Sequence, residues 1–137
     1  MSAKKISATW ASLGPFLQSL LRIVTAVLFM QPGMMKLFAY PMGIPPNGGT
    51  VRLLTELGLA GILETFGGAL LFLGIYTRPV AFLLSGEMAV AYFQVHFPRG
   101  YWPLMNGGTD AVFYCFLWLF FSAAGAGPLS VDALRGK

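Results

Sequence analysis

Four polar side chains within otherwise apolar stretches of the sequence are the main candidates for chemistry. Arg22 and Gln31 lie in LGPFLQSLLRIVTAVLFMQPGMMKLF (residues 13–38), and Glu64 and Glu87 lie in two later apolar stretches. A charge left alone in hydrocarbon costs at least about 2.5 to 3.5 kcal/mol on insertion scales. We therefore expect these side chains to pair with one another or to line a polar pocket, as ligand-binding or proton-relay residues.

The charges of these residues allow two interpretations. An ion pair between Arg22 and Glu64 would only fix the register of two helices, and it would leave Glu87 unexplained. A neutral, protonated Glu87 is the simplest way to balance the remaining charge. If the apolar stretches form antiparallel helices, the rise of about 1.5 Å per residue brings Gln31, Glu64 and Glu87 to within about one turn of a common level. That arrangement favours a pocket.

A second polar group is expected near the external ends of the helices. It comprises Lys36, His96, Asn106 and Asp110. A single histidine without a second histidine or a cysteine does not indicate a metal, so we predict no metal site, and interfacial anchoring is the alternative role. Cys115 is the chain's one cysteine, which rules out a disulfide or a CxxC pair within one chain. No motif identifies a cofactor.

The composition indicates a membrane protein. Hydrophobic residues make up 56% of the 137 residues, charged residues make up 10%, and the mean hydropathy is +0.69, unlike a soluble domain. Because about 20 apolar residues cross a bilayer, the length accommodates about four spans. We predict an all-α membrane protein, an antiparallel four-helix transmembrane bundle in one domain over residues 1–137, with spans at 16–37, 57–76, 80–97 and 110–126.

Small residues and prolines predict local details of these helices. A stripe of Gly58, Gly61, Thr65 and Gly68 should let two helices approach closely in lipid, and Pro32 should interrupt and kink the first span. The sequence also predicts an early start of the second helix within 51–56, a tight turn at 77–79, loops at 39–50 and 98–109, and a short surface turn in the tail VDALRGK.

The basic residues predict an orientation. One side of the predicted spans carries Lys4, Lys5, Arg78, Arg135 and Lys137, and the other carries Lys36, Arg52 and Arg99. The positive-inside rule thus favours both termini in the cytoplasm and both long loops outside. Because the basic residues are scattered singly, we expect the lipid bilayer and not nucleic acid as the partner.

An ordered set of motifs resembles the DoxX family of small four-span membrane proteins. The motifs are RIVTAVLF (22–29), GMMKLF (33–38), GILETFGGALLFLGIYTR (61–78), EMAVAYFQVHFPRG (87–100), NGG (106–108), AVFYCFL (111–117) and GAGPLSVD (125–132). The sequence departs from the family pattern at Pro32, where a histidine is frequent, and at Thr109, where a glutamate is usual. The resemblance implies a four-helix membrane bundle and an association with quinone-linked redox, because a related protein is a subunit of a thiosulfate:quinone oxidoreductase. Others are linked to thiol and oxidative-stress systems.

Three functions are compatible with this reasoning. The leading hypothesis is a membrane redox-associated subunit, within a quinone-linked oxidoreductase, whose polar pocket binds a quinone or similar small molecule. The first alternative is a non-catalytic membrane scaffold for a soluble oxidoreductase or thiol-stress enzyme, and the second is a small-solute or proton carrier. A redox-enzyme partner and a homo-oligomer are candidate assemblies, in a bacterial-type cytoplasmic membrane.

Overall fold

The computed structural model describes residues 3–137, with side chains from residue 6 onward, and every regular element in that range is a helix. Two of the elements, η1 and η2, are π-helices. The elements in chain order are α1 (Ala3–Ser12), α2 (Gly14–Phe38), α3 (Glu56–Ile62), η1 (Leu63–Gly67), α4 (Gly68–Leu73), α5 (Thr77–Ala91), η2 (Tyr92–His96), η3 (Phe97–Arg99), α6 (Pro103–Asn106), α7 (Thr109–Ala124) and α8 (Val131–Leu134).

Three helical segments are long and apolar enough to cross a membrane. They are α2, the segment Glu56–Leu73 made of α3, η1 and α4, and the segment Thr77–Arg99 made of α5, η2 and η3. The fourth predicted span corresponds to α7, which is apolar but only 16 residues long. At a rise of about 1.5 Å per residue it covers about 24 Å, less than a hydrocarbon core of about 30 Å. The all-α class is therefore confirmed, whereas a bundle of four full spans is not.

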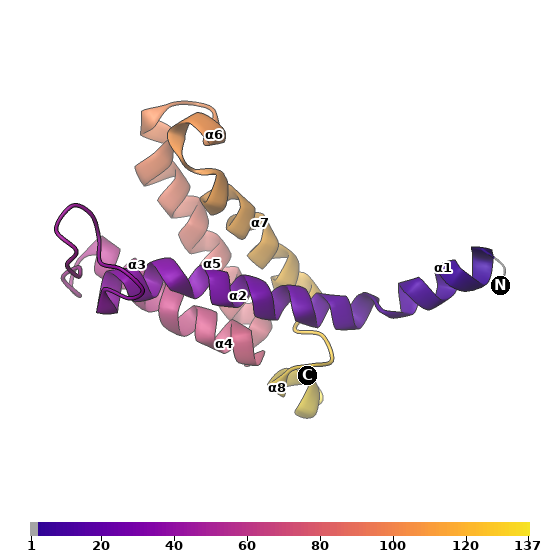
Figure 1. The fold of residues 1–137 in the computed structure, drawn as a ribbon. Coiled ribbons are helices and arrows are strands. Elements are labelled where there is room, and N and C mark those ends of the chain that lie inside the picture. The colour runs from indigo at the N-terminus through magenta and orange to yellow at the C-terminus, as the bar shows by residue number, and fades with distance from the viewer. Residues whose placement is uncertain (1–2) are drawn as a thin grey trace.

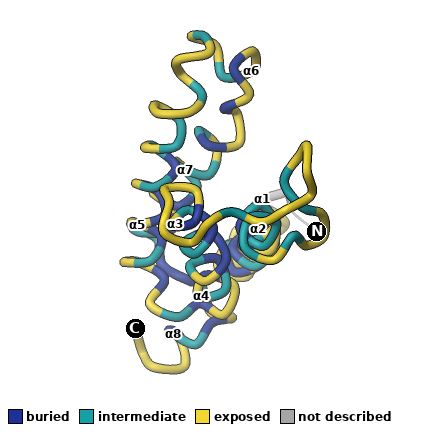
Figure 2. Tube along the Cα trace, turned by 90° about the vertical axis from the view of Figure 1, so that its left-hand side faces the viewer, coloured by how far each residue is buried: buried dark blue, intermediate teal, exposed yellow. Residues whose placement is uncertain are grey.

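The helices form two antiparallel hairpins. In the N-terminal hairpin, α2 packs along α3, η1 and α4, and in the C-terminal hairpin, α5 packs along α7. The two hairpins cross and then diverge, so that α6 lies far from α3 (Figure 1). Buried residues gather where the hairpins cross, while the outer end of the α5–α7 pair is mostly exposed (Figure 2). The helices thus pack as two crossing hairpins that share one central core.

Aromatic side chains hold the crossing together. Phe29 of α2 is buried against two rings of α7, with ring centroids 5.4 Å from Trp118 and 5.0 Å from Tyr114. Trp118 and Phe121 of α7 are completely buried in the same core, which also contains Leu71 of α4. Edge-to-face ring pairs of this kind add about 0.5 to 1.5 kcal/mol to the burial of apolar area. Phe29 is therefore a principal contact between the hairpins.

The small residues of the predicted stripe do permit close approach within the N-terminal hairpin. A Cβ atom added at Gly68 would lie 2.5 Å from Met30 Cγ, and one added at Gly61 would lie 3.0 Å from Leu37 Cδ2. On α2 itself, a Cβ atom at Gly33 would lie 2.5 Å from Thr65 Oγ1. Glycine at these positions lets the two helix backbones pack closely, as expected for helices in lipid.

Pro32 has no N–H to donate and so removes one hydrogen bond from the ladder of α2, but the helix continues to Phe38. Two local predictions are wrong. Residues 51–55 are not helical, because Thr55 is the N-cap of α3 and its Oγ1 accepts a hydrogen bond from the backbone N–H of Gly58 at 3.1 Å. Residues 77–79 are not a tight turn between helices but the first turn of α5. Pro79 is tolerated there because the N–H groups of a first helical turn have no partner within the helix. The chain reverses just before them, with Gly74 and Tyr76 in left-handed conformations.

Arg22 is completely buried and binds backbone carbonyl groups instead of Glu64. Its Nη1 donates to the carbonyl groups of Phe72, at 2.6 Å, and Leu71, both in the last turn of α4. Its Nε donates to Ala126 at 2.9 Å and its Nη2 to Leu129 at 2.5 Å, both in the segment after α7. The last carbonyl groups of a helix have no partners within the helix and favour a cation. The predicted Arg22–Glu64 ion pair is therefore wrong.

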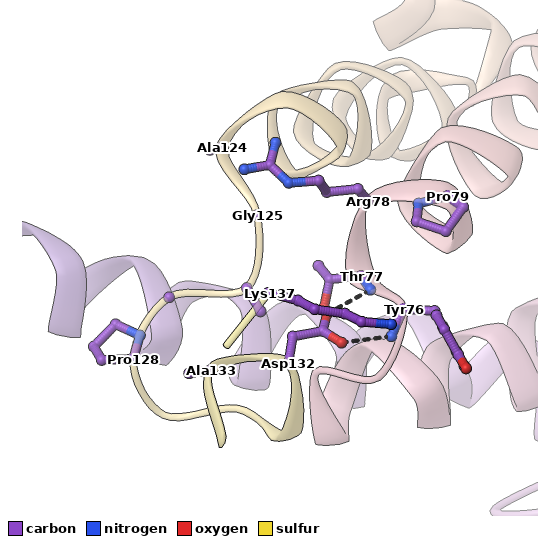
Figure 3. Close-up of a pocket in the computed structure, with 12 residues that line it drawn as sticks. Tyr76, Thr77, Arg78, Pro79, Ala124, Gly125, Pro128, Asp132, Ala133 and Lys137 are labelled. Carbon is purple, nitrogen blue, oxygen red and sulfur yellow. Dashed lines mark hydrogen bonds between the residues drawn. The ribbon is translucent and has the colours of Figure 1, made fainter. Parts of the chain in front are cut away.

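The C-terminal tail is a docked element and not a surface turn. Asp132, at 8% exposure, accepts hydrogen bonds from the backbone N–H groups of Tyr76 at 2.9 Å and Thr77 at 2.8 Å (Figure 3). Its own N–H donates to the carbonyl group of Gly74 at 2.9 Å. The carboxylate thus caps the first turn of α5, whose N–H groups have no other helical partner.

We predict that Arg22→Leu lowers the stability of the protein in detergent by about 3 kcal/mol or more, because a buried acceptor left without a donor costs about 1 to 3 kcal/mol. Thermal unfolding of the purified protein measures the effect, with the exposed Arg52→Leu as the matched control. Since Glu64 is not the partner, Glu64→Leu should not restore the loss. Restoration in the double variant would revive the ion-pair interpretation.

Asp132 makes a pH-dependent contribution to stability. Burial opposes ionisation, but the hydrogen bonds from Thr77 and Tyr76 outweigh it and lower the pKa of Asp132 below its usual value. A lowered pKa contributes stability that is present above the unfolded value of about 3.9 and is lost as pH falls through the folded value. Asp132→Asn should therefore lower thermal stability at neutral pH by about 1 to 2 kcal/mol.

The difference between Asp132→Asn and the unaltered protein should shrink as pH falls below about 4, because the native carboxyl is then protonated too. Thermal unfolding over a pH series measures this, with the exposed Asp110→Asn as control. A constant difference at every pH would show that the charge of Asp132 contributes nothing.

Candidate functional site

An ion pair between Lys36 and Glu64 connects α2 to η1. The Lys36 Nζ atom lies 2.5 Å from Glu64 Oε2, and the side chains are only 15% and 7% exposed. The sequence placed Lys36 with the external polar group, but its long side chain reaches back into the N-terminal hairpin. A buried ion pair requires good geometry to offset the loss of hydration, and this pair is in direct contact.

Glu87 of α5 is the third member of this cluster. Both carboxyl oxygens are buried, and neither has a hydrogen-bond partner among the residues that the structure describes. Glu64 and Lys36 are the charged groups that act on it electrostatically. Lys36, Glu64 and Glu87 are hereafter called the ionisable cluster. It contains two carboxyl groups and one cation at the contact between the two hairpins.

A π-helix and a glycine position Glu64. Glu64 lies in η1, and a π-helix adds one residue to the turn, which changes the direction of the side chains that follow. A Cβ atom at Gly33 would lie 2.8 Å from Glu64 Cβ, so only glycine leaves room for this approach to α2. Thr65 beside it has a buried Oγ1 without a partner within residues 3–137. Single π-turns frequently occur at functional sites.

Two residues of the predicted pocket lie elsewhere. Gln31 is exposed on the surface of α2, so it does not join the carboxyl groups. Arg22 is 14 residues before Lys36 on the same helix, a separation of about 21 Å along the axis. Glu64 and Glu87 lie on η1 and α5, which contact each other, and Glu64 acts electrostatically on Glu87. The cation that accompanies them is Lys36 and not Arg22.

The other external candidates mainly order the loop around α6. His96 Nδ1 lies 3.2 Å from the carbonyl oxygen of Asn106. Asn106 is buried, donates to the carbonyl group of Gly100 at 2.8 Å and accepts from the N–H of Gly108 at 2.8 Å. Asp110 is exposed in the first turn of α7, where a carboxylate suits the helix dipole. These contacts give His96 and Asn106 a structural role that the sequence could not separate from a ligand site.

The sequence does not predict two important polar contacts. One is the binding of Arg22 to backbone carbonyl groups, and the other is the capping of α5 by Asp132. The S-x-D segment that follows GAGP was a usable signal, because Ser130 caps α8 and Asp132 then points back to α5. Among residues 3–137, no group of three His, Cys, Asp or Glu side chains is placed to hold a metal ion.

The fold and the buried charges define an integral membrane protein. The model of the DoxX family matches residues 17–97, a range that includes the ionisable cluster and Arg22, and the chain belongs to this family. An uncharacterized protein of Haemophilus influenzae is 40% identical over 121 residues, covering 86% of this chain and 90% of that protein. No solved structure matches the chain.

The ion pair predicts energetic coupling between Lys36 and Glu64. We expect the variants Lys36→Met and Glu64→Gln each to destabilise the protein, because each leaves a buried partner without its counter-ion. The double variant should be more stable than the sum of the two losses predicts, with a coupling of about 0.5 to 3 kcal/mol. Denaturation in detergent measures the cycle. A cycle of Lys36→Met with the exposed Glu56→Gln is the control, and equal coupling in both cycles would contradict a specific pair.

Proposed function

We propose that this protein is a redox-associated membrane subunit that binds a quinone, or a similar lipophilic molecule with ring carbonyl groups, at the ionisable cluster. One observation supports this above all others: the carboxyl group of Glu87 is buried in a membrane segment, and neither oxygen has a hydrogen-bond partner among residues 3–137. Ionisable residues within membrane spans are costly and commonly mark functional sites. Glu87 thus has hydrogen-bonding capacity that the fold leaves unused.

The charges of the cluster favour a neutral Glu87. Lys36 already has its counter-ion in Glu64, so a second carboxylate would be an uncompensated charge in hydrocarbon. A protonated carboxyl group has one O–H donor, and a quinone carbonyl oxygen is an acceptor. The proposed contact is therefore a hydrogen bond from Glu87 to one ring carbonyl oxygen.

The ligand would reach Glu87 from the bilayer. The carboxyl oxygens are buried at the contact between α5 and η1, so the two hairpins have to separate there to admit a ring. A π-turn at this position has fewer constraints from regular packing than an uninterrupted helix and suits such a movement. Lipophilic quinones diffuse within the hydrocarbon, where this contact lies.

Protons and electrons would come from different sources in this proposal. Reduction of a quinone to a quinol takes up two electrons and two protons. The electrons would come from a partner oxidoreductase that oxidises its own substrate, since the single cysteine provides no dithiol in this chain. Glu87 would give one proton to a quinone oxygen; water would then protonate the Glu64 carboxylate, which would pass that proton to Glu87 before the second transfer.

A direct test measures binding of a short-chain ubiquinone analogue to the purified protein in nanodiscs. We expect Glu87→Leu to weaken binding at least about tenfold, which corresponds to about 1.4 kcal/mol for one lost hydrogen bond. Glu87→Gln keeps an N–H donor, so it should retain most of the affinity but fail to support quinone reduction with the partner enzyme. The exposed Gln31→Leu is the matched control. Unchanged binding in Glu87→Leu would refute the assignment.

The scaffold alternative is favoured by the ion pair, which satisfies two of the three charges within the protein. A scaffold predicts that a soluble oxidoreductase remains bound to the Glu87→Leu variant and that no quinone analogue binds to any form. A small-solute or proton carrier predicts instead a flux into liposomes that Glu87→Leu abolishes. Pull-down and flux measurements on the unaltered protein and on the Glu87→Leu variant separate these alternatives from the quinone site.

A further inference from the structure

A surface cleft of about 330 Å³ lies at the end of the molecule that carries the C-terminal tail. Its walls come from the first turn of α5, the segment after α7 and the tail, which are far apart in the sequence (Figure 3). The ends of α4, α5 and α7 meet here. Because these are the ends of apolar helices, the cleft lies at the level where membrane hydrocarbon gives way to the headgroups.

Two exposed cations, Arg78 and Lys137, line this cleft, and a third, Arg135, lies over the ring of Tyr76 in its rim. Arg78 lies in one wall, where its Nη1 donates to the carbonyl group of Ala123 at the end of α7. Its Nη2 lies beside Gly125, where an added Cβ atom would come within 3.2 Å. On the opposite side Lys137 Nζ lies 5.2 Å, and Arg135 Cζ 5.8 Å, from the ring centroid of Tyr76. These contacts hold the side chains in place, and none of the three forms a salt bridge with a carboxylate among residues 3–137.

The one carboxylate of the lining is already used. Both oxygens of Asp132 accept backbone N–H groups of α5, so the carboxylate acts as a helix cap, and Arg135 acts on it electrostatically. Arg78 and Lys137 line the same cleft, which leaves a local excess of positive charge. Exposed Tyr76 in the rim has the amphipathic ring that is enriched at membrane–water interfaces.

We propose that this cleft binds the phosphate group of an anionic lipid headgroup, with Arg78 and Lys137 as its principal cations. Arginine presents several N–H donors that match phosphate oxygens, and lysine adds a mobile point charge. The position of the cleft at the headgroup level favours a lipid over free phosphate as the source. This proposal is independent of the quinone site, which lies at the other end of α2.

The test is native mass spectrometry of the protein released from nanodiscs of phosphatidylcholine and phosphatidylglycerol in equal amounts. We expect the protein to retain phosphatidylglycerol in preference to phosphatidylcholine. Arg78→Gln should reduce this preference about fivefold, the effect of one basic residue at a membrane surface. Arg52→Gln, an exposed arginine in the loop between α2 and α3, is the matched control and should leave the preference unchanged.

A second variant guards against loss of folding, because Arg78 also contacts α7. Lys137→Gln removes a cation from an exposed side chain, so it should reduce the lipid preference without lowering thermal stability. Equal retention of both lipids by the unaltered protein, or an equal effect of Arg52→Gln, would overturn the proposal. Stabilisation by inorganic phosphate in pure phosphatidylcholine nanodiscs, without any preference for phosphatidylglycerol, would show that the cleft binds free phosphate and not a lipid headgroup.

Discussion

The buried guanidinium group of Arg22 joins the end of α4 to the segment that follows α7. A buried guanidinium group has several N–H donors, and inside a membrane these donors need hydrogen-bond acceptors from the protein. Arg22 obtains them from the last turn of α4 and from the segment that follows α7, which are remote in sequence. One side chain of α2 therefore fixes where the N-terminal hairpin ends and how the chain after α7 returns to it. Asp132 completes this region by capping α5.

This use of Arg22 determines the charge balance of the ionisable cluster. Because the guanidinium group binds carbonyl groups, Glu64 and Glu87 are left with one cation between them. Lys36 contacts Glu64 directly, so the oxygens of Glu87 have no hydrogen-bond partner within the described part of the chain. Arg22 itself lies about 21 Å from Lys36 along the axis of α2. Had Arg22 paired with Glu64, Lys36 would have been available to neutralise Glu87.

The two ends of the molecule differ in how tightly the hairpins are held together. At the tail end, hydrogen bonds made by Arg22 and Asp132 hold the helix ends, and Arg78 and Lys137 line a cleft. Toward the other end the hairpins diverge (Figure 1), and the ionisable cluster lies at their contact beside a π-turn. An anchored end and a looser end would allow the hairpins to part at Glu87 without unfolding the core around Phe29 and Trp118.

The helical segments and the close approach at the glycine stripe could be predicted from the sequence, because they follow from the length of apolar runs and from the spacing of small residues along a helix. The partners of Arg22, the reach of Lys36 and the docking of Asp132 depend on contacts between segments that are remote in the sequence. Every residue has a carbonyl group, so carbonyl acceptors leave no mark in a sequence. The shortness of α7 and the divergence of the hairpins likewise depend on where helix ends are held, which is set by contacts between remote segments.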